Sequence, residues 1–163
     1  MYLKKLFIIF FIFAIIGTTA CASKNPNENS IFPTKITTAK ENSKMKININ
    51  INNKTDLKAT LYDNSSARTL FELLKKGEIT INMQDYSNFE KVGDLPISLP
   101  RNDVPTNTDA GDLILYLGKK FAIYYDKNNW NFTPLGKIDE ITKSELKTIL
   151  GSGDVTAVLS VSK

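Results

Sequence analysis

Residues 111–126 read GDLILYLGKKFAIYYD, and this stretch decides the fold class. A short apolar run over 113–117 and a largely apolar one over 121–126 are separated by Gly-Lys-Lys at 118–120, which is typical of a tight turn. Two strands joined this closely must pair antiparallel, because a parallel pair needs a crossover of roughly a dozen residues or more. The stretch therefore predicts a β-hairpin within an antiparallel sheet.

More short strands are predicted on both sides of this hairpin. Apolar and polar residues alternate over 45–51 and again over 57–61, with the turn sequence Asn-Asn-Lys after the first run, so a second hairpin is predicted. Helical spacing predicts a helix over 67–74, and a capping box at Thr142–Glu145 predicts the start of another. The remaining strands are predicted over 78–84, 89–92, 135–138 and 155–161.

Eight short strands and two helices within residues 44–163 predict a mainly β domain. Strands this short, joined mostly by turns, favour a closed antiparallel eight-stranded β-barrel over a parallel sheet. The domain is large enough to bury its own core, and we expect a monomer. A central strand is excluded in the proline-rich segment that precedes the central hairpin, at Pro96, Pro100 and Pro105.

Residues 1–20 have the composition of a targeting segment. Lys4 and Lys5 precede an unbroken apolar run over 6–16, which has the length of a signal-peptide core and is too short to span a bilayer. The string Gly-Thr-Thr-Ala that follows ends at Cys21 and resembles the lipobox of bacterial lipoproteins. The resemblance implies that Cys21 is lipidated and becomes the mature N-terminus. The alternative is an ordinary secretory peptide that leaves Cys21 as a free thiol.

Residues 21–43 comprise the lipidated cysteine and a predicted disordered tether, because this polar segment cannot bury enough apolar surface to fold. An alternative is that Ile31, Phe32 and Ile36 form an additional edge strand. We expect the barrel domain to be extracytoplasmic and held on the bacterial membrane by its lipid anchor.

The counts of histidine and cysteine exclude several classes of site. The chain has 21 Lys and Arg against 17 Asp and Glu, one cysteine and no histidine. A Ser-His-Asp triad, a Cys-His pair, a histidine-based zinc site and an internal disulfide are therefore all excluded. No basic stripe with interleaved aromatic residues is present, so nucleic-acid binding is not expected. No cofactor or metal is predicted either, since the spacing of Asp85, Asp109 and Asp112 matches no calcium loop.

Four local strings are informative because of their order along the chain. They are LYDN at 61–64, FEK at 89–91 followed by Leu-Pro at 95–96, AGDL at 110–113 and LGKI at 135–138. Together they resemble the bacterial cyclophilin-like domains, a divergent branch of the cyclophilin superfamily. The resemblance covers nearly the whole predicted domain and implies an eight-stranded antiparallel barrel closed by a helix at each end.

True cyclophilins catalyse prolyl cis/trans isomerisation, and the resemblance implies a groove with an arginine and a histidine. The arginine polarises the peptide bond at the proline and so lowers the barrier to its rotation. Arg68 and Arg101 both fall outside the segment 81–91, where the family's arginine belongs, and Phe132 stands at the position of the histidine. Lys91 or Glu90 could substitute for it, although lysine lacks the planar fork of arginine.

A groove is nevertheless predicted from the resemblance and from the aromatic residues. Cyclophilins have a Met and Gln pair at the positions of Met83 and Gln84. Alternation on the central hairpin places Tyr124 on the opposite face from Phe121, and residues 127–131 are predicted to form a loop beside it. The candidate groove residues are Met83, Gln84, Glu90, Tyr116, Tyr124, Trp130 and Phe132.

These observations favour a binding module over an enzyme. Aromatic rings with polar tips suit a peptide or a planar small ligand. Glu90 has the alternative of a solvated position on the barrel face. For the whole domain, the alternatives are a residual peptidyl-prolyl isomerase and a structural or assembly partner of another envelope protein. No catalytic residue is assigned.

Overall fold

The computed structural model describes residues 44–163, and this part of the chain contains nine strands and two helices. The helices are α1 (Ser65–Leu74) and α2 (Lys143–Leu150). The strands are β1 (Lys46–Ile51), β2 (Thr55–Leu61), β3 (Ile79–Tyr86), β4 (Glu90–Asp94), β5 (Val104–Asn107), β6 (Asp112–Tyr116), β7 (Lys120–Tyr124), β8 (Asn129–Ile138) and β9 (Val155–Val161).

The N-terminal predictions lie outside the described residues. They are the signal peptide over 1–20, the lipidated Cys21 and the tether over 21–43, including its alternative edge strand. Neither α1 nor α2 is long and apolar enough to cross a membrane, and the described part of the chain contains no other helix that does.

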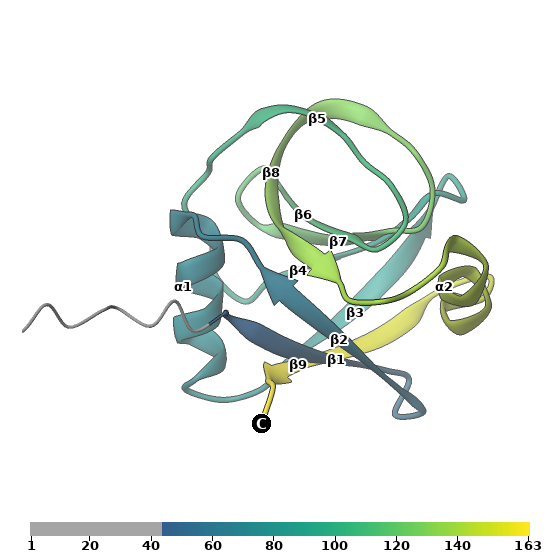
Figure 1. Ribbon diagram of the computed structural model, residues 1–163, viewed down its shortest axis with the longest axis horizontal. Coiled ribbons are helices and arrows are strands. Elements are labelled where there is room, and N and C mark those ends of the chain that lie inside the picture. Colours follow the sequence, from purple (N-terminus) through teal and green to yellow (C-terminus); the bar gives the residue numbers. More distant parts are fainter. Residues whose placement is uncertain (1–43) are drawn as a thin grey trace, which may run out of the picture. The chain divides into compact units, whose positions relative to one another are not determined.

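Eight of the nine strands form a closed antiparallel barrel. Neighbouring strands follow the order β2-β1-β9-β3-β4-β7-β6-β8, and β2 pairs with β8 to complete the ring. The two helices lie on opposite sides of the barrel, and β5 is added outside the ring by pairing with β8 (Figure 1). The mainly β, eight-stranded barrel with two helices is confirmed, and β5 adds one strand to it.

Side chains alternate between the barrel interior and its outer face. On β7, Phe121 and Ile123 are buried in the main core, whereas Ala122 and Tyr124 belong to a second apolar cluster on the outer face, together with Phe132 of β8. This is the alternation predicted for the central hairpin. The outer cluster is the base of the groove described below.

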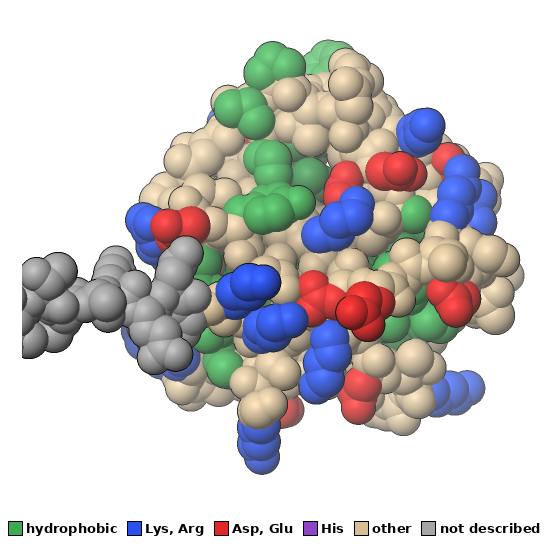
Figure 2. Space-filling view, viewed as in Figure 1, with side chains coloured by type: hydrophobic (Ala, Val, Ile, Leu, Met, Phe, Trp, Pro, Cys, Tyr) green, Lys and Arg blue, Asp and Glu red, His purple; other side chains and the backbone are tan. Residues whose placement is uncertain are grey.

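The prediction of a loop over 127–131 was wrong, because β8 begins within it and Trp130 lies on that strand. The polar sequence there lacks the alternation of a half-buried strand. β5 supplies the pairing instead, with Thr106 opposite Trp130, and Pro105 is tolerated because β5 is an edge strand. Val104 on β5 and Trp130 on β8 are both exposed. Figure 2 shows hydrophobic side chains at the top of the view, the part in which Figure 1 places β5.

Lys91 on β4 is fully buried and holds the C-terminal end of α2 against the barrel. Its ammonium group lies 3.2 Å from the Asp85 carboxylate and donates to the carbonyl oxygens of Gly151 and Gly153 at 3.1 and 2.6 Å. A cation is favoured at this end of a helix by the helix dipole. The hypothesis that Lys91 substitutes for a groove arginine is therefore wrong, because its charge is fully occupied on the other side of β4.

Asp85 is ionised in this arrangement. Burial alone raises the pKa of its carboxyl group, but hydrogen bonds from the Tyr125 hydroxyl and from Lys91 outweigh burial and hold the pKa below its ordinary value of 3.8. The hydroxyl of Tyr125 donates to Asp85 at 2.6 Å. The buried cation thus has a counter-ion that is itself fixed by a hydrogen bond.

Barrel closure depends on a close crossing of β8 over β2 at Gly136, which pairs with Leu61. A Cβ atom at position 136 would lie 2.4 Å from the backbone oxygen of Thr60 and 2.8 Å from the Cα atom of Leu61. Both of these atoms belong to the backbone, so neither can move aside without shifting the strand. Glycine at 136 is what allows the last pair of strands to meet.

We predict that Gly136→Ala lowers the free energy of unfolding by about 2–3 kcal/mol, because overpacking between two backbones forces β2 and β8 apart. Urea denaturation monitored by circular dichroism measures the change. The matched control is Gly77→Ala, where an added Cβ meets nothing within 4 Å, and it should leave stability unchanged. Equal effects of the two substitutions would contradict this account of closure.

We further predict that Asp85→Asn lowers the free energy of unfolding at pH 7 by about 3 kcal/mol, because it leaves the buried Lys91 without its counter-ion. The folded-state pKa of Asp85 is depressed, so this stabilisation is complete above pH 3.8 and is lost as the pH falls through the folded-state pKa. The difference in the free energy of unfolding between wild type and variant, measured by urea titration, should therefore become smaller below pH 3.8.

A control for this experiment is Asp63→Asn, which removes an exposed ion pair with Arg68. Exposed pairs contribute roughly 0–1 kcal/mol, so this substitution should have little effect at either pH. A gap between wild type and Asp85→Asn that stays constant down to pH 2 would show that the Asp85 charge does not stabilise the fold.

Candidate functional site

A groove of about 1000 Å³ crosses the outer face of the barrel. Three neighbouring strands, β3, β4 and β7, form its centre, with β9 on one side and β6 and β8 on the other. Every second residue of each central strand faces it, as alternation requires. These residues are Asn82, Gln84 and Tyr86 on β3, Glu90, Val92 and Asp94 on β4, and Lys120, Ala122 and Tyr124 on β7.

The pairing register places these residues in rows across the groove. In one row Glu90 stands between two tyrosines, with Tyr86 opposite it on β3 and Tyr124 opposite it on β7. The next row consists of Gln84, Val92 and Ala122. The small side chains of Val92 and Ala122 fill little space, and the hollow lies above them between larger side chains.

Five aromatic rings form a continuous row, which we term the aromatic wall. Phe89 stacks on Tyr124 with ring centroids 5.9 Å apart and planes inclined by 16°, and Tyr86 meets Phe89 edge to face at 5.7 Å. Tyr124 contacts Phe132 at 5.7 Å, and Phe132 contacts Tyr116 at 5.9 Å. Each ring is thus held by its neighbours in a geometry that aromatic pairs prefer.

The turn between β3 and β4 brings Phe89 into this wall. Ser87 and Asn88 have φ angles of 50° and 58°, in the left-handed region, which turns the chain sharply between the two strands. The carbonyl oxygen of Phe89 then accepts from the backbone N–H groups of Tyr125 and Asp126 at 2.9 and 3.1 Å. The turn before Phe89 and the hydrogen bonds to its carbonyl oxygen therefore fix the backbone that carries the ring.

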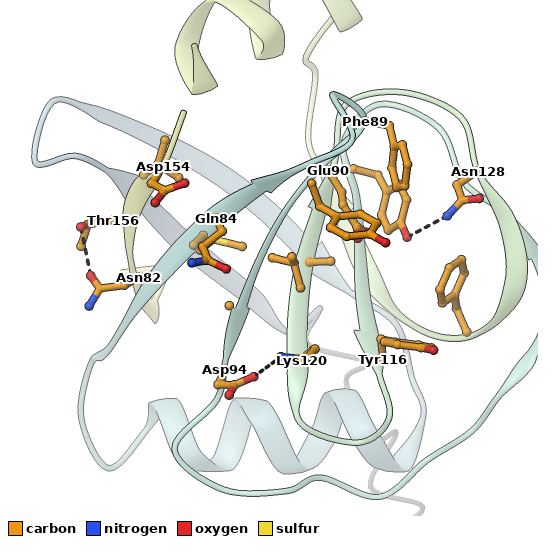
Figure 3. A pocket seen from close by; sticks show the side chains of 18 of the residues that line it. Asn82, Gln84, Phe89, Glu90, Asp94, Tyr116, Lys120, Asn128, Asp154 and Thr156 are labelled. Atoms are coloured by element: carbon orange, nitrogen blue, oxygen red, sulfur yellow. Dashed lines mark hydrogen bonds and ion pairs between the residues drawn. The ribbon is translucent and has the colours of Figure 1, made fainter. Parts of the chain in front are cut away.

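Glu90 and Tyr124 form the polar centre of the aromatic part of the groove. Burial raises the pKa of Glu90, and contact with the Tyr124 hydroxyl opposes that rise. Burial and the Glu90 carboxyl group both raise the pKa of Tyr124. The hydroxyl therefore keeps its proton at neutral pH, and it accepts a hydrogen bond of 3.4 Å from the Asn128 amide (Figure 3).

Amide and hydroxyl groups line the other part of the groove. Figure 3 shows Asn82, Gln84 and Thr156 together on the side away from Asn128, and the Thr156 hydroxyl donates to Asn82 at 3.2 Å. An ion pair of 2.8 Å between Lys120, at the start of β7, and Asp94, at the end of β4, lies at one end of the groove. One part of the groove thus offers ring faces, and the other offers groups that pair with peptide-like donors and acceptors.

The structure brings all seven predicted groove residues to this one groove. They are Met83, Gln84, Glu90, Tyr116, Tyr124, Trp130 and Phe132. Met83 also belongs to the main core and is 1% exposed, whereas the side chain of Trp130 is largely accessible, at 62% exposed. That these residues bind a ligand remains a prediction.

Sequence reasoning missed several residues that line the same groove. Alternation from Gln84 along β3 places Asn82 and Tyr86 on one face with it, so the signal for those two was present. Phe89 had no such signal, because the left-handed turn before it interrupts the alternation. Asn128 was hidden in the segment predicted to be a loop.

Neither arginine of the chain lies in the groove. Arg68 pairs with Asp63, and Arg101 pairs with Asp103. Among the described groove residues the basic side chain is Lys120, which is held by Asp94. Residues 44–163 contain no group of three or more His, Cys, Asp or Glu side chains arranged to hold a metal ion.

Comparison with known proteins identifies a family and a similar solved structure. The solution structure of a hypothetical protein from Archaeoglobus fulgidus is similar at 13% sequence identity and a TM-score of 0.49, over 73% of this chain and 95% of the other. No curated protein matches the chain. The sequence pattern of the cyclophilin-like family matches residues 49–160, which is well over half of the chain. The chain therefore belongs to the cyclophilin-like family.

Proposed function

We propose that this domain is a binding module whose outer groove takes a peptide or a small organic ligand. The observation that carries the proposal is the groove itself, with about 1000 Å³ bordered by five contacting aromatic rings and by a few polar side chains. Ligand sites in proteins commonly have this size and this combination of apolar walls with sparse polar groups.

The proposal does not include prolyl isomerisation. That reaction needs a cation placed to polarise a peptide bond. Lys120 is paired with Asp94 at the end of the groove, and Lys91 is buried on the other face of β4. Phe132, at the position where the cyclophilin resemblance implies a histidine, packs against Tyr116 and Tyr124 and has no polar atom to offer a substrate.

We also propose that the domain is extracytoplasmic and anchored to a bacterial membrane through lipid on Cys21. The support is the sequence before the domain, in which Lys4 and Lys5 precede an apolar run and small residues lead to Cys21. Two or more acyl chains, at roughly 0.8 kcal/mol per buried methylene, would hold the protein stably on a membrane.

We predict that Tyr86→Ala weakens ligand binding about tenfold, because Tyr86 is a largely exposed end of the aromatic wall and its loss removes ring area from the groove. The probe is a set of capped tetrapeptides Ala-Xaa-Pro-Ala in which Xaa is varied. Trp130 is the only tryptophan of the chain and borders the groove, so its fluorescence reports binding to the full chain.

The matched control is Tyr62→Ala, which removes another exposed tyrosine that does not line the groove. It should leave the binding of every peptide unchanged. If no peptide alters Trp130 fluorescence, or if the two variants behave alike, the binding proposal fails and a structural or assembly role takes its place. A protease-coupled isomerisation assay on the same peptides should show no acceleration by the full chain.

We predict that Cys21→Ser moves the protein from the membrane fraction to the soluble fraction, because serine cannot carry the thioether-linked lipid. Fractionation of expressing bacterial cells, followed by immunoblotting, measures the distribution. Ser23→Ala is the control and should stay with the membrane. Unchanged fractionation of Cys21→Ser would refute the lipid anchor.

A further inference from the structure

We propose that the groove selects ligands that carry an organic cation, an ammonium or a guanidinium group, and that the cation is held by Glu90 among the rings of Tyr86, Phe89 and Tyr124. This inference rests on the proposed binding function and names the chemistry of the ligand. It follows from the unmatched charge of Glu90, from the rings around it and from the charge of the groove as a whole.

Glu90 is a half-buried carboxyl group without a cationic partner in the described part of the chain. None of the nine ion pairs within residues 44–163 includes it. The nearest lysine in sequence, Lys91, points to the opposite face of β4 and is paired with Asp85. Removing a carboxylate from water without a counter-ion is unfavourable. A cation bound beside Glu90 would compensate this cost.

The residues around Glu90 are suited to a cation. The strand register places it directly between Tyr86 and Tyr124, and Phe89 stacks on Tyr124 with planes inclined by 16°. Aromatic faces attract cations within about 6 Å of the ring centroid. Figure 3 shows Phe89 and Glu90 close together at one end of the groove, with Asn128 beside them. Tyr124 is 1% exposed and is covered by the stacked Phe89, so the ring that a cation beside the carboxylate would contact is that of Tyr86, which is 58% exposed.

The charge of the groove points the same way. Its lining contains three carboxylates, of Glu90, Asp94 and Asp154, against the single ammonium group of Lys120. The groove lining therefore has a formal charge of −2. A concave surface of one sign concentrates ligands of the opposite sign. Lys120 pairs with Asp94, which leaves Glu90 and Asp154 as the lining carboxylates without an ion pair in the described part of the chain, and of these Glu90 lies between the tyrosines.

Two sources can supply such a cation. A lysine or arginine side chain of a peptide would present it on an extended stem, and the amides of Asn82 and Gln84 would then face the peptide groups. A free small amine would bind only at Glu90 and would not contact these amides. The chemistry at Glu90 is the same for both, and the two sources are distinguished by whether an amine without peptide groups binds.

The test measures the binding of three probes to the full chain by Trp130 fluorescence. The probes are capped Ala-Lys-Pro-Ala, the same peptide with an acetylated lysine, and n-butylammonium. We expect acetylation of the lysine to weaken binding about tenfold, since it removes the charge and keeps the stem. Glu90→Gln should weaken the lysine peptide by a similar factor and leave the acetylated peptide unchanged.

The control variant is Glu78→Gln, which removes an exposed carboxylate outside the groove, and it should change the lysine peptide's affinity less than about twofold. Binding of n-butylammonium that depends on Glu90 supports a small amine as a sufficient ligand. A requirement for the peptide, with the same dependence on Glu90, supports a basic peptide segment.

Equal affinity for the lysine and acetyl-lysine peptides overturns the inference, and this comparison in the wild-type protein does not depend on how any variant folds. In that case the binding function survives if Tyr86→Ala still weakens both peptides. If no peptide of the varied set binds, the proposed function fails as well, so the two failures are distinguishable.

Discussion

The structure depends on the contact between the backbones of β2 and β8 at Gly136. No other residue fits at this crossing without displacing the Thr60 carbonyl or the Leu61 backbone, because a Cβ atom would lie 2.4 Å from the Thr60 oxygen. The contact joins the first and last strands of the ring and so gives the sheet a closed interior. Closure also fixes the curvature of the barrel sheet. This curvature shapes the outer surface of β3, β4 and β7, on which the groove lies.

On each of these strands, alternate side chains face the barrel interior and the groove. On β4, Lys91 pairs with Asp85 of β3 and donates to two carbonyl oxygens at the end of α2. Its neighbour Glu90 faces the groove. On β7, Phe121 fills the main core, while Tyr124 joins the aromatic wall. The residues that stabilise the fold and the residues that form the groove are therefore interleaved in sequence. A one-residue shift in register would exchange them.

The alternating strands and the helix caps made the fold predictable from the sequence. The seven candidate groove residues came partly from the cyclophilin resemblance and partly from alternation on the central hairpin, and all seven line one groove. The sequence did not reveal that β8 starts at Asn129, because its polar beginning is stabilised by pairing with β5, a contact between distant segments. It also did not reveal the burial of Lys91, since nothing local shows that its partners are Asp85 on β3 and the carbonyl oxygens of the residues that follow α2.

We propose that the groove at Glu90 and the aromatic wall is the ligand site of this cyclophilin-like domain. The most direct measurement is a nuclear magnetic resonance titration of the isotope-labelled full chain with capped Ala-Lys-Pro-Ala. The account predicts that the shifted resonances cluster on Gln84, Glu90 and Asn128 and on the indole of Trp130. Shifts that cluster instead around the shallow depression between Asn107 and Asn129, or that spread evenly over the barrel, would contradict it.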